Sequence, residues 1–234
     1  MVPLRALCLA AALALPLPAR AGCDLALVLA LDVSSSVDAR EYALQRDGLA
    51  AALNAPDVRN ALLGTPGRWV SLAAFEWSGR YKQSTVLDWT ALRSEADLAR
   101  VTVRLAAAQR SETEFPTALG YGLGYAAGLL ARAPDCARKV VDVSGDGINN
   151  DGFGPHLAYA HFPFEGVTVN ALVIEDGSAP LSAYFRREVL RGPGAFLEPA
   201  TGYGAFERAM TRKLLREIGS LIVGAAGPGA RDGG

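Results

Sequence analysis

An apolar run over residues 25–31 leads directly into a turn that is rich in side-chain oxygens. A short apolar run of this kind is typical of a β-strand that is buried on both faces. The turn reads Asp-Val-Ser-Ser-Ser over residues 32–36, with a carboxylate and two hydroxyls at alternate positions. Mg²⁺ and similar hard cations prefer oxygen ligands. The stretch therefore predicts a central strand whose end can carry a metal site.

The remainder of the chain alternates between segments typical of strands and segments typical of helices. Strands are expected at residues 24–32, 69–77, 139–143, 167–174 and 195–198, and helices at 38–54, 57–63, 94–108, 118–133, 181–190 and 203–223. Such alternation predicts a mainly parallel sheet with helices on both faces. Residues 82–89 follow the second strand after a short polar turn, so they are expected to pair with it in an antiparallel hairpin. One α/β domain accounts for the whole pattern.

The beginning of the chain has the features of a secretory signal peptide. Arg5 supplies a positive charge, residues 6–17 are apolar, and Ala-Arg-Ala at 19–21 is a small-x-small cleavage site. The apolar stretch is too short for a transmembrane helix. We therefore expect residues 1–21 to be a signal peptide and the mature protein to be exported, either to the periplasm or out of the cell.

Length and composition limit the other classes of protein. Half of the 234 residues are hydrophobic (50%), which is enough for one sizeable core. The net charge is -1 and there is no basic patch, so nucleic acid is not an expected partner. No later segment is apolar enough to anchor the chain in a membrane. The domain is expected at residues 22–224, and the Gly- and Ala-rich residues 225–234 are expected to be a disordered tail.

Export also bears on the cysteines. Cys8 lies in the expected signal peptide, so the mature protein would keep only Cys23 and Cys136. Two cysteines in an oxidising compartment are expected to pair. Two buried free thiols are the alternative.

Polar side chains from three separate segments are candidates for one site. In an open parallel sheet, ligands bind beyond the carboxyl ends of the strands. Asp32 and Asp146 each follow an expected strand, and Thr117 lies in a loop that opens a helix. Together with Ser34 and Ser36, they form the donor set of a divalent metal site made of side-chain oxygens and a few waters.

Two alternatives to this interpretation stay open. The serines could act only as helix N-cap residues that accept from backbone N–H groups. Thr113 lies in the same loop as Thr117 and could take its place.

The sequence does not supply a convincing nucleophile and base. Ser144 lacks the glycine two residues before it that a nucleophile elbow requires. His156 and His161 are expected in a loop, without an acidic partner. We therefore predict no catalytic residue.

The oxygen-bearing segments resemble the metal-binding motif of von Willebrand factor type A (VWA) domains. Residues 32–36 are similar to the family's Asp-x-Ser-x-Ser, Thr117 to its separate threonine, and Ser-Gly-Asp-Gly at 144–147 to its Asp-Gly after a central strand. The resemblance covers residues 23–223 and is closest to an exported bacterial branch of unknown function. It implies a three-layer, doubly wound, Rossmann-like fold with one antiparallel edge strand. One departure is Ser-Glu-Thr-Glu-Phe-Pro at 111–116, where the family more often has Gly-Gly.

The resemblance also implies a function. In VWA domains these residues form a metal-ion-dependent adhesion site that usually holds Mg²⁺. Ser34 and Ser36 would bind the ion directly, and Asp32, Thr117 and Asp146 would bind it directly or through water. An open position would take an acidic side chain from a protein ligand.

The expected protein is thus an exported, non-catalytic binding module that uses Mg²⁺, with Mn²⁺ or Ca²⁺ as alternatives. A metal-dependent hydrolase of phosphates or esters at the same site is an alternative function. An envelope scaffold with a vestigial site is another. The oligomeric state is left open.

The family's sheet order also places the strands that precede Asp32 and Asp146 side by side. Cys23 lies nine residues before Asp32, and Cys136 lies ten before Asp146. The cysteines would then be level at the opposite end of the sheet, in agreement with a disulfide.

Four further side chains are candidates for a rim around the ligand. Glu76 and Trp77 end the strand at 69–77, and Asn149 and Asn150 lie in the loop after residue 146. Packing at the strand end is the alternative for the first pair, and turn formation is the alternative for the two asparagines.

Overall fold

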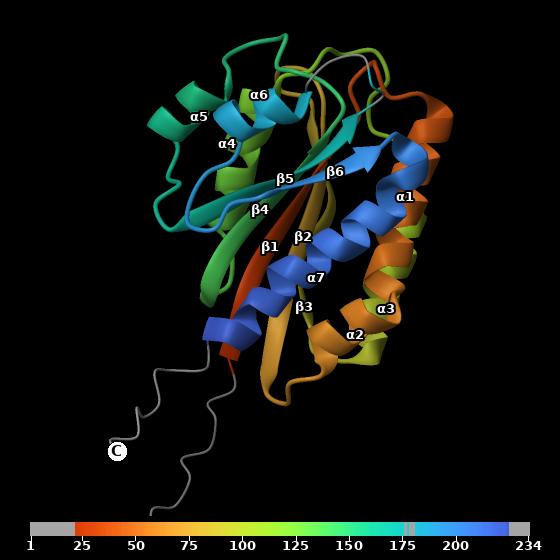
Figure 1. Cartoon of the computed structure of the whole chain (residues 1–234), viewed down its shortest axis with the longest axis vertical. Coiled ribbons are helices and arrows are strands. Elements are labelled where there is room, and N and C mark those ends of the chain that lie inside the picture. Colours follow the sequence, from red (N-terminus) through yellow and green to blue (C-terminus); the bar gives the residue numbers. More distant parts are fainter. Residues whose placement is uncertain (1–21, 176, 178–180, 225–234) are drawn as a thin grey trace, which may run out of the picture.

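The computed structural model describes residues 22–224, apart from 176 and 178–180. The expected signal peptide at 1–21 and the expected tail at 225–234 lie outside the described residues. Within the described part, one twisted sheet lies between two layers of helices (Figure 1). The expected three-layer α/β fold is confirmed.

The sheet has six strands in the order β3-β2-β1-β4-β5-β6. The strands are β1 (Gly22–Asp32), β2 (Arg68–Trp77), β3 (Gln83–Leu92), β4 (Cys136–Gly145), β5 (Val167–Glu175) and β6 (Leu197–Thr201). The edge strand β3 is antiparallel to β2, and all other neighbours are parallel. The predicted antiparallel hairpin is therefore confirmed, and β1 lies in the interior of the sheet.

Helices cover both faces of the sheet. They are α1 (Ala39–Asn54), α2 (Pro56–Leu63), α3 (Glu95–Ala106), α4 (Leu119–Leu130), α5 (Pro155–His161), α6 (Leu181–Glu188) and α7 (Phe206–Gly224), with the short 3₁₀ helix η1 (Tyr203–Ala205) before α7. One hydrophobic core joins the sheet to α1, α2, α3 and α7, and a second joins it to α4, α5 and α6. Figure 1 shows α7 crossing one face of the sheet, with α4 and α5 behind the other.

The position of β1 explains its apolar sequence. Leu27 and Leu29 belong to the core under α1 and α7, whereas Val28 and Ala30 belong to the core under α4. Side chains of a strand alternate between the two faces of a sheet, so a strand covered on both faces needs apolar residues at every position. The run ends where the sheet ends, at Asp32.

The helix after this strand begins as its sequence indicates. Asp38 is the N-cap of α1, and its Oδ1 accepts from the backbone N of Glu41 at 2.8 Å. Glu41 Oε2 accepts from the backbone N of Asp38 at 2.8 Å in return. This capping box satisfies N–H groups that the first turn of a helix leaves unpaired. It fixes the point at which the loop after β1 ends.

Several boundaries differ from the prediction, and one element was missed. Residues 155–161 form α5, so the prediction that His156 and His161 lie in a loop is wrong. With seven residues this helix is too short to show a periodic pattern, although its proline at the first helical position is a typical start signal. Strand β4 begins at Cys136 rather than at residue 139 because it pairs with β1 from Cys23 onwards.

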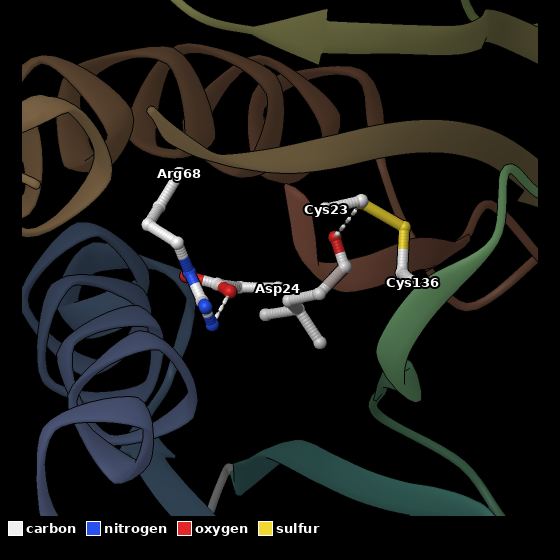
Figure 2. Close-up of a disulfide and its surroundings, with 5 residues drawn as sticks. Cys23, Asp24, Arg68 and Cys136 are labelled. Atoms are coloured by element: carbon white, nitrogen blue, oxygen red, sulfur yellow. Dashed lines mark hydrogen bonds and ion pairs between the residues drawn. A yellow bond between two sulfur atoms is a disulfide. The ribbon is translucent and has the colours of Figure 1, made fainter. Parts of the chain in front are cut away.

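The predicted disulfide is confirmed, and it lies at the amino-terminal ends of β1 and β4. Cys23 and Cys136 are direct partners in the parallel register of β1 and β4, with a Cα–Cα distance of 4.5 Å. Their sulfurs are bonded, so the alternative of two free thiols is wrong. Figure 2 shows the bridge beside the ion pair between Asp24 and Arg68. The bond ties together the two strands whose other ends carry Asp32 and Asp146.

Across residues 22–224, the described positions contain no helix with the length and apolar character needed to cross a bilayer.

Candidate metal-binding site

Three loops meet at the carboxyl ends of β1 and β4. The first, residues 33–38, connects β1 to α1, and the second, residues 107–118, connects α3 to α4. The third, residues 146–154, connects β4 to α5. Since β1 and β4 are parallel neighbours, their ends bring the first and third loops together. This is the edge at which open α/β sheets bind ligands.

The first loop folds around the carboxylate of Asp32. Asp32 ends β1 with 0% of its surface exposed, and its Oδ1 accepts from the backbone N of Ser34 at 2.8 Å. The hydroxyl oxygens of Ser34 and Ser36 lie 3.2 Å apart. The alternate spacing in the sequence therefore places three oxygen-bearing side chains on one side of the turn.

The other two loops complete the cluster. Asp146 Oδ1 accepts from the hydroxyl of Ser36 at 2.8 Å, and Thr117 donates its hydroxyl to Ser34 Oγ at 3.3 Å. Thr117 is buried against the serines, whereas Thr113 is exposed. The structure thus brings together Asp32, Ser34, Ser36, Thr117 and Asp146, and it favours Thr117 over Thr113 as a member of the group.

Burial and charge set the properties of Asp32. Two causes together raise the pKa of the Asp32 carboxyl to about 7: burial, which is the larger, and the neighbouring carboxylate of Asp146. Asp32 Oδ2 is buried and has no hydrogen-bond partner among the described residues. Most buried polar atoms have a partner, so an unpaired carboxylate oxygen calls for a ligand or a water. A bound cation would satisfy this oxygen and offset the repulsion between the two carboxylates.

Two glycines leave room beside the carboxylate and the threonine. A Cβ added to Gly145 would lie 3.2 Å from Asp32 Oδ2, which is closer than an ordinary van der Waals contact. A Cβ on Gly147 would lie 3.4 Å from Thr117 Oγ1. Glycine at position 145 avoids this close contact, and glycine at position 147 adds no atom beside the threonine hydroxyl. The donor set fits a small, hard cation.

The cluster depends on hydroxyls as much as on carboxylates. Within residues 22–224, the described positions contain no group of three or more His, Cys, Asp or Glu side chains that could hold a metal. An ion at this edge would therefore be bound by Ser and Thr oxygens, two Asp carboxylates and water. Hard cations such as Mg²⁺ accept such ligands.

The two predicted rim asparagines contact Thr117 and α4. Asn150 Oδ1 accepts from the backbone N of Thr117 at 2.8 Å, and the backbone N of Asn150 donates to Thr117 O at 2.9 Å. Asn149 Oδ1 accepts from the backbone N of Gly120 at 3.2 Å. These bonds fix Thr117 at the start of α4, so both asparagines support the cluster.

The other two predicted rim residues are buried. Glu76 and Trp77 are each 1% exposed, which agrees with the alternative of packing at the strand end and not with a ligand rim. The Glu76 carboxylate accepts from Tyr42 OH and from the backbone N of Ser111, both at 2.7 Å. Trp77 packs in the core with α4. A strand end in the interior of a sheet is covered by the loops around it, which the local sequence does not reveal.

One residue next to the cluster was not predicted. The buried Tyr203, from η1, donates its hydroxyl to Asp146 Oδ2 at 3.2 Å. Burial and the Asp146 carboxylate raise the pKa of this phenol, so it stays protonated and acts as a donor. No motif marks Tyr203, because its role depends on how the start of α7 packs against the sheet.

The fold is similar to that of VWA domains. Residues 22–222 match the model of a family described as "Protein of unknown function (DUF1194)", and the chain belongs to this family. A search of curated proteins found no match to the sequence.

Several solved structures share the fold at low sequence identity. The von Willebrand factor type A protein from Catenulispora acidiphila is 14% identical with a TM-score of 0.61, and covers 85% of this chain and 43% of its own. Proximal thread matrix protein 1 from the mussel byssus is 16% identical with a TM-score of 0.60, and the match covers 85% and 47%. The PilB minor pilin from Streptococcus sanguinis is 12% identical with a TM-score of 0.65, and the match covers 91% and 65%. The chain thus spans less than half of the first two proteins, and these similarities establish the fold alone.

Proposed function

We propose that the protein is an exported, non-catalytic binding module that recognises a protein ligand through a bound divalent cation, Mg²⁺ by preference. The ligands of the cation are Asp32, Ser34, Ser36, Thr117 and Asp146. The observation that carries this proposal is the buried Asp32 Oδ2, which lacks a hydrogen-bond partner among the described residues. Asp32 directly precedes the loop whose serine hydroxyls meet the Thr117 hydroxyl from a second loop and the Asp146 carboxylate from a third.

The charge of the donor set supports a binding role. Two carboxylates and neutral hydroxyls leave a divalent cation with positive character towards an incoming group. Mg²⁺ also keeps exchangeable waters when proteins bind it. An acidic side chain of a partner can replace one of these waters and complete the coordination.

Two other observations support metal binding and export. One structure of the mussel byssus protein is described as having a "zinc occupied MIDAS motif", so this fold can hold a divalent metal at such a motif. The Cys23–Cys136 disulfide is typical of proteins from oxidising compartments. Together with the features of residues 1–21, it supports export to the periplasm or beyond the cell.

Capture of a partner tests the proposal. The immobilised protein is incubated with envelope extract in the presence of Mg²⁺, washed, and eluted with EDTA. A parallel column carries the Ser34→Ala and Ser36→Ala double variant, which removes two proposed ligands. A protein that elutes with EDTA from the wild type alone is the expected result. Equal retention of the partner on both columns would contradict binding through the metal.

A further inference from the structure

The guanidinium of Arg110 lies beneath the loop that carries the two serines. Its Nη2 donates to the backbone oxygens of Val33 and Ser34, at 3.0 and 2.9 Å. Arg110 belongs to the segment 107–118, which also carries Thr117. One side chain therefore joins the two loops from which the proposed hydroxyl ligands come.

Other bonds connect the same two loops. The backbone N of Ser35 donates to Phe115 O at 2.8 Å, and Thr117 donates to Ser34 Oγ at 3.3 Å. Arg110 differs from these contacts because its side chain binds the first two residues after β1, Val33 and Ser34. Without it, the carbonyls of Val33 and Ser34 would lose a charged donor, and bonds to charged donors are among the stronger hydrogen bonds.

A buried carboxylate fixes the base of Arg110. The backbone N of the next residue, Ser111, donates to Glu76 Oε2 at 2.7 Å, and Tyr42 OH donates to Glu76 Oε1 at 2.7 Å. Glu76 is 1% exposed and belongs to β2. Glu76 thereby holds the backbone next to Arg110 against β2 and α1. Because its backbone is fixed in this way, the Arg110 side chain can hold the serine loop at a defined position relative to the sheet.

We propose that Arg110 is a positioning residue that sets the separation of the hydroxyl ligands Ser34 and Thr117. This inference rests on the proposed function, because it concerns the same cation site. Mg²⁺ requires nearly octahedral geometry with ligands at about 2.0–2.1 Å, so small displacements of its ligands weaken binding. Neutral hydroxyls attract the ion less than carboxylates do, and their placement must compensate.

The sign of the effect separates positioning from charge. The guanidinium is positive, so its electrostatic action on a nearby cation is repulsive. If charge were its main influence, removal of Arg110 would strengthen Mg²⁺ binding. If it positions the ligands, removal weakens Mg²⁺ binding. Arg110→Met removes both charge and donors, whereas Arg110→Lys keeps the charge and loses the guanidinium geometry.

The test measures Mg²⁺ affinity by calorimetry for wild type, Arg110→Met and Arg110→Lys. Arg104→Met is the matched control, because Arg104 also donates to a backbone oxygen, that of Val86 at 3.1 Å, but from α3. Loss of residues that orient metal ligands typically costs about 10–100-fold in affinity. We expect a loss in that range for Arg110→Met, a loss also for Arg110→Lys, and none for Arg104→Met. Unchanged or tighter binding by Arg110→Met would overturn the proposal.

A second readout does not depend on metal. Hydrogen exchange of the Ser35 amide, measured in EDTA, should be faster in both Arg110 variants than in wild type and unchanged in Arg104→Met. If wild type does not bind Mg²⁺ but this difference is found, the proposed function fails while Arg110 retains its positioning role. Equal exchange in wild type and in both Arg110 variants would refute that role. If Arg110→Met does not fold, Arg110→Lys decides both measurements.

Discussion

The hydroxyl of Ser36 donates to the carboxylate of Asp146 at 2.8 Å, across 110 residues of sequence. This bond joins the loop after β1 to the loop after β4, and the parallel pairing of the two strands makes it possible. At the opposite end of the same strands, Cys23 and Cys136 are covalently joined. The two central strands are thus tied at one end and carry the candidate site at the other.

The carboxyl of Asp32 should make the metal-free protein sensitive to pH. Its pKa is about 7 in the folded protein and near 4 in an unfolded chain, so the folded state holds the proton more tightly. Its contribution to the free energy of unfolding is therefore greatest below pH 4 and is lost as the pH rises to about 7. Relative to Asp32→Asn, wild type should lose on the order of 2 kcal/mol between pH 5 and 8. Urea unfolding in EDTA at both pH values measures this, and parallel pH dependence in the two proteins would contradict it.

The disulfide should contribute strongly to stability. Cys23 and Cys136 are 113 residues apart, and closing a loop of that length is worth about 4–5 kcal/mol on the chain-entropy estimate. Reduction of the wild type should lower the midpoint of urea unfolding accordingly. The Cys23→Ser and Cys136→Ser double variant is the control, since reductant should not change its midpoint. A wild type that unfolds at the same urea concentration with and without reductant would count against the prediction.

The buried ammonium of Lys213 should be essential for the stability of α7. It is 0% exposed, and its Nζ lies 2.6 Å from Glu217 Oε1 and 2.8 Å from Asp142 Oδ1. Removal of one partner from a buried ion pair costs about 3–5 kcal/mol, because charge is left uncompensated. Lys213→Met should destabilise the protein by that amount in urea unfolding.

The neighbouring residue Arg212 provides the control for this prediction. Arg212 forms an ion pair with Glu198 at 2.6 Å, and its side chain is largely exposed. Such surface pairs contribute about 0–1 kcal/mol. Arg212→Met should therefore be nearly neutral. Equal losses in the two variants would show that burial of Lys213 does not set its importance.

Local sequence was sufficient to predict the parts of the molecule that depend on short-range pattern. The apolar run before Asp32 predicted β1, because that strand is covered on both faces. The helices predicted at 38–54 and 94–108 begin in the structure at their N-cap residues, Asp38 and Ser94. Spacing alone could not bring Thr117 to Ser34; the oxygen chemistry of its loop made Thr117 a candidate, and the family resemblance supported it.

Contacts made by tertiary packing could not be predicted in the same way. Glu76 and Trp77 were candidates for a rim or for packing at the strand end, and the structure buries both, Glu76 against Tyr42 and Ser111 and Trp77 against α4. Tyr203 and Arg110 contact the cluster from segments that carry no motif, and their partners lie far away in sequence. Their positions depend on how α7 and the segment 107–118 pack, which no local pattern encodes.

Calorimetric titration with Mg²⁺ and Mn²⁺ tests the central claim most directly. Wild type, Asp32→Ala and Asp88→Ala are compared, because Asp88 is a carboxylate of β3 outside the cluster. The account predicts binding of one ion by wild type and by Asp88→Ala, and none by Asp32→Ala. Wild type and Asp32→Ala that bind alike, or a wild type that binds neither ion, would contradict a metal site at the end of β1.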